Sequence, residues 1–357
     1  MFINGLRMNG AVVTECHEPF WEIFEEKDAG FGFHFSTILQ FLRCQLKLAW
    51  KYATKIPDHD VVIVGFIGQP DMFLAKLLTW LTGRKLVVNP LVSIFDTVVG
   101  DRQFVHQTSV KARFFKWLDG VSCKLADLVF LDTQAHIAYF CGEFGINPNR
   151  FKRIWVGADE HVFKPLESTG QHSKAFKILF VGKFIPLHGI PKIVETAQLL
   201  ESSPYIQFTL IGKGQLHQEI EAQITALGLK NVDLIDWVPY EELSRVMSES
   251  DLILGIFGDS EKAKRVIPNK VYQALAVGKP VLTMDSVASR ELLVRDENAF
   301  LVENTPEAMA EMIRYLKEHK EKCNAVGAAG YQLFMEQLNT SVIGNDVLHA
   351  IQVRVID

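Results

Sequence analysis

Apolar runs rich in β-branched residues alternate with helical patterns along the whole chain, and this alternation restricts the fold more than any other feature. The N-terminal half contains AVVTEC near residue 11, DVVIVGFIG near 60, KLVVN near 85, DLVFLD near 127 and RIWVG near 153. The C-terminal half contains FKILFVG, YIQFTLIG, NVDLIDW, DLILGIF and KPVLTM. Apolar strands separated by helices are typical of parallel sheets built from right-handed βαβ units. The sequence therefore predicts an α/β protein with two doubly wound domains.

A polar stretch separates the two series of strands. The sequence KPLESTGQHSKA lies between Phe163 and Phe176, carries Pro and Gly, and shows no periodicity. Such a stretch is typical of a linker. We expect one domain over residues 1–165 and a second that begins at residue 166.

Composition excludes several classes of protein. The chain has 357 residues, a net charge of −5 and an apolar content of 48%, which is enough for two cores but argues against a general nucleic-acid binder. No apolar run is long enough to span a bilayer, and no signal peptide is recognisable at the start. The five cysteines lack CxxC spacing, which argues against a disulfide framework or a zinc knuckle. We expect a soluble, cytoplasmic protein.

The segment 176–200 predicts an anion site. An apolar strand leads into a loop that contains Gly182, Lys183, His188 and Gly189, and a helix opened by Pro191 follows. Free backbone N–H groups and the helix dipole then point at one place, which favours a bound phosphate. Both glycines also fit simple turn positions, and Lys183 also fits a solvated loop.

A second element with the same logic covers residues 268–282. Asn269 suits the N-cap of a helix and Gly278 suits its C-terminal stop. Lys270 then lies in the first turn, where a cation meets the positive end of the helix dipole. A ligand phosphate would compensate that charge.

The pair FVGKFIPLHGI and IPNKVYQALAVGKPVL resembles the C-terminal half of the GT-B glycosyltransferases, specifically the retaining family 4 (glycosyl transferases group 1) type. The resemblance covers residues 160–325 well and the N-terminal half more loosely. It implies two Rossmann-like domains facing across a cleft: an acceptor-side domain over 1–165 and a nucleotide-sugar donor domain over 166–325. It also implies that the tail over 326–357 ends in a helix that packs back on the first domain.

The resemblance also assigns donor-binding residues. Lys183 and His188 would grip the donor diphosphate, although the family usually has Lys or Arg where His188 stands. The helix that begins near Asn269 and Lys270 would contact phosphate and ribose. The family usually has Glu at the positions of Gln273 and Arg265, so neither carboxylate is present, and Glu261 is the nearest one. We place these residues at the donor site: Gly182, Lys183, His188, Gly189, Gly212, Trp237, Val238, Asn269, Lys270 and Gln273.

Two of these donor-site residues have plain alternatives. The sequence IGKG, which contains Gly212, matches a dinucleotide fingerprint only in part, because no third Gly follows at the required spacing. Trp237 serves equally well as a core residue or as a base-stacking residue.

The N-terminal half departs from the family pattern. The chain starts at MFINGLRMNG, which we interpret as the helix leading into AVVTEC. The first strand and its Gly-rich loop are therefore expected to be missing, either because the start is truncated or because that strand is absent.

Two strand ends supply the polar candidates of the first domain. Asp96 follows the KLVVNP strand and is the best acceptor-side candidate, with an N-cap or turn role as its alternative. Asp132, Thr133 and His136 lie at the end of DLVFLD and would face the cleft, and Asp132 and Thr133 also fit a helix cap.

We expect no metal ion. Asp58-His59-Asp60 looks like a metal-binding DxD but precedes its strand, which places it at the wrong end of the sheet. No HExxH or Cys/His cluster occurs elsewhere. A metal-independent reaction is therefore favoured, with the nucleotide-diphosphate sugar as co-substrate and no cofactor.

The stretch KARFFKWLDGVSCK, residues 111–124, mixes basic and aromatic residues. Such a helix either lies in an anionic membrane surface, giving peripheral contact at the inner membrane face, or buries its aromatic side chains against a sheet. The second interpretation is the one we favour from sequence.

The chain is thus predicted to move a sugar from a nucleotide-diphosphate donor to an acceptor hydroxyl on a glycan or lipid-linked acceptor, with retention. Lys183, His188 and Lys270 would stabilise the leaving diphosphate, and Asp96 would act on the acceptor side. The alternatives are a nucleotide-sugar epimerase of the same architecture and a non-catalytic nucleotide-sugar binder or partner subunit.

Overall fold

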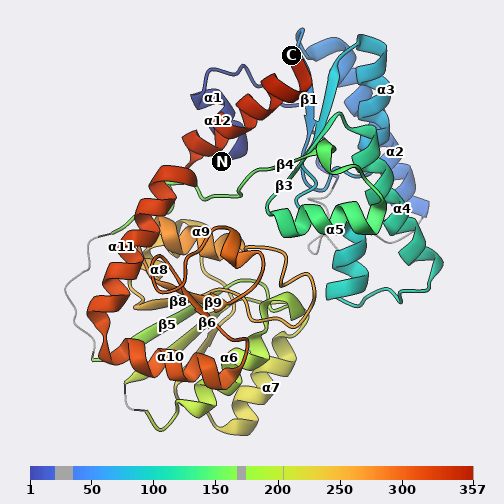
Figure 1. Ribbon diagram of the computed structural model, residues 1–357. Helices are drawn as coiled ribbons and strands as arrows, with labels where there is room; N and C mark the ends of the chain where they lie inside the picture. The colour runs from blue at the N-terminus through green and yellow to red at the C-terminus, as the bar shows by residue number, and fades with distance from the viewer. Residues whose placement is uncertain (21–34, 167–173, 204, 357) are drawn as a thin grey trace. The chain divides into compact units, whose positions relative to one another are not determined.

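The structure is a computed structural model that describes residues 1–20, 35–166, 174–203 and 205–356 (Figure 1). These residues form two compact units, which we describe separately. The N-terminal unit contains Leu6–Asp132, Ile137–Ile154 and Gly344–Asp357, and the C-terminal unit contains Met1–Gly5, Thr133–His136 and Trp155–Ile343. The predicted linker lies partly on residues 167–173, outside the described residues. The predicted domain limits stay predictions.

The C-terminal unit is built on a six-stranded parallel sheet in the order β10-β9-β8-β5-β6-β7. The strands are β5 Phe176–Val181, β6 Ile206–Ile211, β7 Val232–Ile235, β8 Leu252–Leu254, β9 Val281–Met284 and β10 Phe300–Val302. The helices are η5 Pro186–His188, α6 Ile190–Leu199, α7 His217–Leu227, α8 Tyr240–Ser248, α9 Asn269–Ala276, η6 Ser289–Glu291, α10 Pro306–Glu318 and α11 Lys320–Gln337. α12 Thr340–Ile351 begins in this unit and continues in the N-terminal unit.

The order of this sheet is that of a doubly wound fold. The chain runs outward from β5 through β6 to β7, then returns to the other side of β5 and runs outward again through β8, β9 and β10. The winding direction therefore reverses between β5 and β8. In open parallel sheets, ligands bind beyond the carboxyl ends of the strands at such a reversal.

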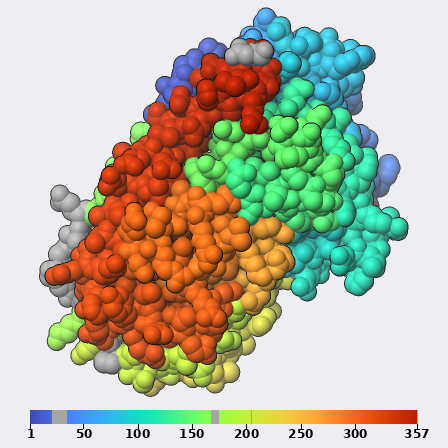
Figure 2. Space-filling model, viewed as in Figure 1, coloured from blue at the N-terminus to red at the C-terminus, as the bar shows by residue number. Residues whose placement is uncertain are grey.

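The core of this unit contains many phenylalanines that are buried from solvent. Phe176 and Phe180 on β5, Phe208 on β6 and Phe300 on β10 are fully buried. α10 packs against α6, and α11 packs against α9. In Figure 2 the orange-red atoms of α10 and α11 cover one face of the unit. The rigid sheet fixes the loops at its carboxyl edge.

The N-terminal unit has a smaller parallel sheet in the order β1-β2-β3-β4. Its strands are β1 Val61–Val64, β2 Lys85–Val88, β3 Leu128–Leu131 and β4 Phe151–Arg153. The remaining helices of the chain are α1 Phe2–Met8, α2 Phe35–Lys55, α3 Met72–Thr82, η3 Asp96–Asp101, α4 Val110–Leu125, α5 Gln134–Phe144, η4 Pro148–Arg150 and η7 Gln352–Ile356.

The predicted strand AVVTEC is wrong. Residues 11–16 have no regular structure, and Val12 is 95% exposed. An apolar run forms a strand only where neighbouring strands pair with it and bury it. The predicted helix before it is present as α1.

The segment Asp58-His59-Asp60 precedes β1, as predicted, and its side chains have structural partners. Asp58 forms an ion pair with Arg84, and the ring Nε2 of His59 lies 3.0 Å from the hydroxyl of Tyr52. Within the described ranges, no group of three or more His, Cys, Asp or Glu side chains is arranged to hold a metal ion.

Candidate functional site

The candidate site lies where the loops after β5 and β8 meet. The backbone N–H of Phe257 donates to the carbonyl oxygen of His188 at 3.1 Å. A Cβ atom placed on Gly189 would lie 2.3 Å from the carbonyl carbon and oxygen of Phe257, and Gly189 has φ +66°. Only glycine allows this approach, so Gly189 holds the two loops together at the reversal of the sheet.

Lys270 is buried at this place without a polar partner. Its side chain extends from the first turn of α9, and the residue is only 5% exposed. Its Nζ atom lies 3.7 Å from the centroid of the Phe180 ring, and no described residue forms a hydrogen bond with it. Burial holds the pKa of Lys270 well below its ordinary value. Burial therefore disfavours the charged form of Lys270, and a bound anion would oppose this effect.

Gly182 and His188 adjoin the Lys270 ammonium group. A Cβ on Gly182 would lie 2.9 Å from Nζ of Lys270 and 3.1 Å from Cε1 of His188. His188 is 8% exposed, and its Nδ1 lies 2.5 Å from the carbonyl oxygen of Lys183. A carbonyl oxygen only accepts, so Nδ1 is the donor and the tautomer is fixed. The structure therefore brings together Gly182, His188, Gly189 and Lys270 as one cluster.

Two helices begin at this cluster without a side-chain cap. Gly189 precedes α6 and Pro268 precedes α9, and neither has a side chain that accepts from the first turn. The predicted N-cap Asn269 is therefore wrong. Asn269 is the exposed first residue of the helix, because the extended Pro268 takes the cap position. The start of α6 offers few N–H groups, because Pro191 has none and those of Lys192 and Ile193 donate to the carbonyl oxygen of Gly189. The start of α9 is the better candidate for binding an anion.

Lys183 differs from Lys270 in being exposed to solvent. It follows Gly182 directly, so its backbone belongs to the cluster while its side chain extends from it. The charged end of Lys183 could contact the solvent-exposed side of a bound phosphate. A flexible, exposed lysine makes such a contact without the cost of burial.

The loop that contains Gly212 lies directly beside the loop after β5. The N–H of Phe184 donates to the carbonyl oxygen of Lys213 at 2.9 Å, and a Cβ on Gly212 would lie 1.9 Å from the carbonyl oxygen of Gly182. The glycines of the partial fingerprint IGKG thus allow the backbones of the two loops to pack closely. Lys213 pairs with Asp236 at 2.6 Å, and this contact lowers the pKa of Asp236. Sequence reasoning missed this pair.

The remaining donor-side candidates lie further out. Trp237 and Val238 follow β7, the edge strand, which is separated from β5 by β6. Trp237 is 73% exposed, so its alternative as a core residue is wrong. Gln273 is half-buried on α9, one turn after Asn269. Gln273 lies on the same helix as Lys270, and its side chain is partly exposed.

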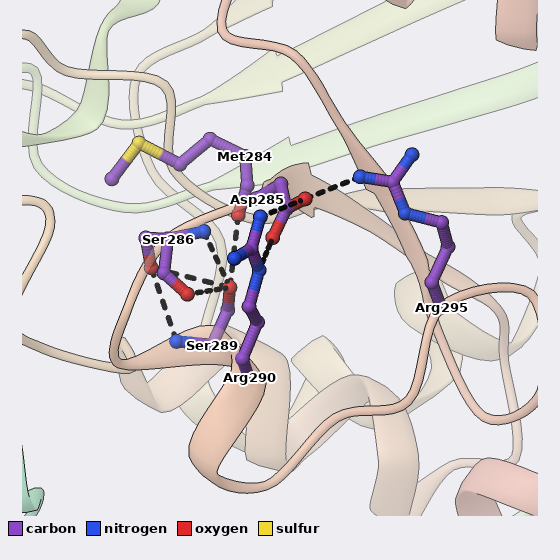
Figure 3. A network of polar contacts seen from close by, with 6 residues as sticks. All are labelled: Met284, Asp285, Ser286, Ser289, Arg290 and Arg295. Carbon is purple, nitrogen blue, oxygen red and sulfur yellow. Dashed lines mark hydrogen bonds and ion pairs between the residues drawn. The ribbon is translucent and has the colours of Figure 1, made fainter.

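A network after β9 neutralises the carboxylate of Asp285 (Figure 3). Arg290 donates to its two oxygens at 2.5 and 2.8 Å, and Arg295 also pairs with it. These contacts lower the pKa of Asp285. Ser286 and Ser289 are buried and cap each other through backbone N–H and hydroxyl groups. The carboxylate of Asp285 therefore pairs with two arginines and stabilises its loop.

In the N-terminal unit, Asp96 begins η3 and is buried. It lines an open pocket of about 550 Å³ together with Gly100, Gln103 and His106. The alternative cap role of Thr133 is confirmed, since its hydroxyl accepts from the N–H of His136 at 3.0 Å. His136 is fully buried. The role of Asp96 toward an acceptor stays a prediction.

Asp119 on α4 holds the loop that leads to Asp96. Its carboxylate accepts from the hydroxyl of Ser93 at 2.7 Å and from the N–H groups of Ile94 and Phe95 at 3.1 and 2.8 Å. Burial raises the pKa of Asp119 to about 6, and the hydrogen bonds oppose this rise. Sequence reasoning missed Asp119, although an Asp beside Phe115 and Leu118 on a helix is a signal of a buried polar anchor.

A match to a family model decides the class of the C-terminal unit. Residues 165–333 match the model described as glycosyl transferases group 1. The match covers most of the C-terminal unit, so this unit is similar to that family. The predicted GT-B fold with two parallel-sheet domains is confirmed as well. The cluster of Gly182, His188, Gly189 and Lys270 lies within the matched residues.

The curated relatives of the chain are distant. The chain is 27% identical over 150 residues to the amylovoran biosynthesis glycosyltransferase AmsK of Erwinia amylovora, covering 40% of this chain and 36% of AmsK. It is 23% identical over 195 residues to spore coat protein SA of Bacillus subtilis, covering 51% of this chain and 50% of that protein. The chain thus spans only about a third to a half of the length of these relatives.

Solved structures share the fold over most of the chain. The Anabaena protein Alr3699/HepE, in complex with UDP-glucose, is 18% identical with a TM-score of 0.69, covering 88% of this chain and 84% of that chain. Sucrose-phosphate synthase from Thermosynechococcus elongatus is 15% identical with a TM-score of 0.69, covering 89% and 78%. At such identities the likeness concerns the fold alone.

Proposed function

We propose that this glycosyltransferase transfers a sugar from a nucleotide-diphosphate donor to an acceptor hydroxyl, with retention and without a metal ion. The observation that carries the proposal is the buried Lys270, which extends from the first turn of α9 and has no hydrogen-bond partner among the described residues. An isolated buried cation is costly, and a bound diphosphate would compensate it.

Charge develops on the leaving diphosphate as the glycosidic bond breaks. Lys270 and the N-terminus of α9 would stabilise that charge from the buried side, and Lys183 from the solvent side. His188, whose Nδ1 is held by the carbonyl oxygen of Lys183, would present the rest of its ring to the ligand. Binding the diphosphate in this way requires cations and N–H groups only, which supports metal independence.

The proposal also names the class of the donor and the class of the acceptor. The structure of Alr3699/HepE holds UDP-glucose, so UDP-sugars are the first donors to test. The name of AmsK refers to amylovoran biosynthesis, which supports a glycan acceptor. Gln273, accessible on α9, would hydrogen-bond a ribose hydroxyl as both donor and acceptor.

One observation favours a non-catalytic nucleotide-sugar binder as the second candidate. Arg265 and Gln273 stand where the resembled family has carboxylates, and Asp285 is neutralised by Arg290 and Arg295. A carboxylate near the transferred sugar is thus lacking at these positions. Such a chain would bind a donor but leave it unchanged.

Release of nucleoside diphosphate from a panel of UDP-, GDP- and ADP-sugars tests the proposal, with and without glycan acceptors. We expect turnover of one nucleotide class that persists in EDTA. Lys270→Met and Lys183→Ala should each lower kcat/KM by about tenfold or more, because a charge-assisted hydrogen bond contributes about 1.5–3 kcal/mol. Lys230→Met is the matched control. Lys230 is exposed and precedes β7, so it lies at the amino ends of the strands, away from the candidate site at their carboxyl ends.

The outcomes separate the candidates. Donor binding without turnover for any acceptor would favour the non-catalytic binder. Conversion of the sugar without an acceptor would favour an epimerase. Turnover that requires a divalent cation would contradict the metal-independent mechanism.

A further inference from the structure

Three helices of the N-terminal unit lie side by side. The hydroxyl groups of Tyr52 on α2 and Thr82 on α3 are 3.1 Å apart, which joins the C-terminal ends of these helices. The rings of Phe73 on α3 and Trp117 on α4 stack with centroids 5.7 Å apart. We call the outer surface of α2, α3 and α4 the helical face.

The helical face exposes large apolar side chains. Trp80 is 73% exposed, Trp50 57% and Trp117 51%. The other exposed apolar residues of these helices are Phe35, Ile38, Leu39, Leu42, Leu46, Phe73, Leu77, Leu81, Val110 and Phe114. Soluble surfaces rarely expose so many apolar residues on neighbouring elements unless the surface binds something.

The prediction that residues 111–124 bury their aromatic side chains is therefore only half right. Phe115 and Leu118 pack inward against the unit, while Phe114 and Trp117 point out and pack on each other at 5.8 Å. Two aromatic residues of α4 thus add to the exposed apolar surface.

The same helices carry a large excess of positive charge. Four basic residues lie on α2, one on α3 and four on α4, whereas their single acidic residue, Asp119, is buried. Glu18 pairs with Lys47 and Lys51, and Glu143 pairs with Lys116, so a surplus remains. The whole chain has a net charge of −5, which makes this local excess a property of the helical face.

We propose that the helical face docks on a lipid bilayer that contains anionic lipids. Trp side chains favour the interface between headgroups and acyl chains, leucines insert below it, and lysines and arginines meet the lipid phosphates. The 21-residue α2 carries Arg43, Lys47, Lys51 and Lys55. In the described part of the chain, no helix is long and apolar enough to cross a membrane. These helices would therefore lie on the bilayer.

Charge argues against other occupants. A second copy docked face to face would bring two cationic surfaces together, which costs energy. A nucleic acid would meet the basic residues but would leave the leucines and tryptophans exposed to water. A bilayer with anionic headgroups satisfies both the apolar and the charged side chains. This proposal is independent of the donor site in the C-terminal unit.

Vesicle flotation of the full chain tests the proposal. The chain should float with phosphatidylcholine vesicles that contain phosphatidylglycerol, much less with phosphatidylcholine alone, and less as salt rises. Trp80→Ser combined with Trp117→Ser should lower the partition coefficient by about tenfold or more. Trp237→Ser is the matched control, because Trp237 is also 73% exposed but lies in the C-terminal unit.

A second pair of variants tests the charge. Arg43→Glu with Arg113→Glu should lower partitioning onto anionic vesicles by about tenfold or more. Lys230→Glu with Lys320→Glu changes the net charge by the same amount at exposed positions outside the helical face, and should leave partitioning near that of the wild type. Circular dichroism verifies that each variant is folded.

Three results would overturn the proposal. The first is no flotation with anionic vesicles, and the second is an equal loss of binding in the test and control variants. The third is that the wild-type chain forms a dimer and that the double variant Trp80→Ser with Trp117→Ser is a monomer. The helical face would then be an interface between copies of the chain.

Discussion

The Nζ atom of Lys270 lies 3.7 Å from the centroid of the Phe180 ring. This cation–π contact lies on the sheet side of the ammonium group, and in the described part of the chain no hydrogen bond supplements it. The contact contributes only about 2 kcal/mol when desolvated, which is less than the cost of burying an ammonium ion. The residue is therefore placed for a ligand at the expense of the stability of the free protein.

Replacement of Lys270 by Met should stabilise the free protein. Met keeps the length of the side chain and removes the buried charge, so we expect the free energy of unfolding to rise by about 1–3 kcal/mol at neutral pH. The folded-state pKa of Lys270 lies below its ordinary 10.5. The unfolded chain then binds more protons between these two pKa values, and wild-type stability should rise with pH across that range. Thermal unfolding of both proteins from pH 7 to pH 10 measures this, and a variant less stable at every pH would contradict it.

Binding of a nucleoside diphosphate should be linked to proton uptake. Burial lowers the pKa of Lys270 in the free protein, and a bound phosphate would raise it again. At a pH above the lowered pKa, the heat of binding should therefore depend on the ionisation enthalpy of the buffer. Calorimetry in Mops and in Tris at one pH measures the proton number, and neither buffer supplies a phosphate that would compete for the site. The Gln273→Ala variant should keep this dependence, because Gln273 does not ionise.

Two glycines of the cluster should respond differently to substitution by alanine. A Cβ on Gly189 meets the backbone of Phe257 at 2.3 Å, so Gly189→Ala should cost about 1–3 kcal/mol of stability or more. Gly182 has φ +150°, which an alanine rarely adopts, and a Cβ there would meet Nζ of Lys270 at 2.9 Å and Cε1 of His188 at 3.1 Å. Gly182→Ala should therefore lower stability as well, and it should weaken nucleotide binding more than Gly189→Ala does because its Cβ points at Lys270. Thermal midpoints and nucleotide affinities of both variants separate these effects. Equal losses in both measurements would count against the assignment of Gly182 to the ligand site.

Asp119 should make the N-terminal unit sensitive to pH. Its pKa is about 6 in the folded protein against an ordinary 3.8, so the protonated form is favoured by folding. The resulting contribution is fully present below pH 3.8 and is lost as pH rises to about 6, with a magnitude of up to about 3 kcal/mol. The Asp119→Asn variant lacks this titration. Wild-type stability relative to the variant should therefore fall from pH 4 to pH 6, and a constant difference would contradict the account.

Local chemistry predicted the cluster well. The strand, loop and helix of residues 176–200 and the helix at 269–276 were recognisable from apolar runs, glycines and prolines, which act over a few residues. The order of strands then brings Gly182 and Lys270 together, because β5 and β8 are neighbours. That Lys270 is buried and without a hydrogen-bond partner depends on Phe180 and the packing around it, which sequence alone does not give.

Sequence reasoning failed where long-range packing decides. Asp119 contacts Ser93 and Asp285 contacts Arg295, and neither pairing has a local signal strong enough to identify it. The segment AVVTEC has the composition of a strand but no strand beside it among the described residues. Asn269 has the chemistry of an N-cap, yet the extended conformation of Pro268 shifts the cap by one residue.

The most direct test of the donor site is calorimetric titration of the chain with UDP, GDP and ADP, beside Lys270→Met and Lys183→Ala. We predict micromolar binding of one nucleotide to the wild type and a loss of about tenfold to 100-fold in each variant. Lys230→Met should bind as the wild type does. Binding that survives unchanged in Lys270→Met, or no binding of any nucleoside diphosphate to the wild type, would contradict the assignment.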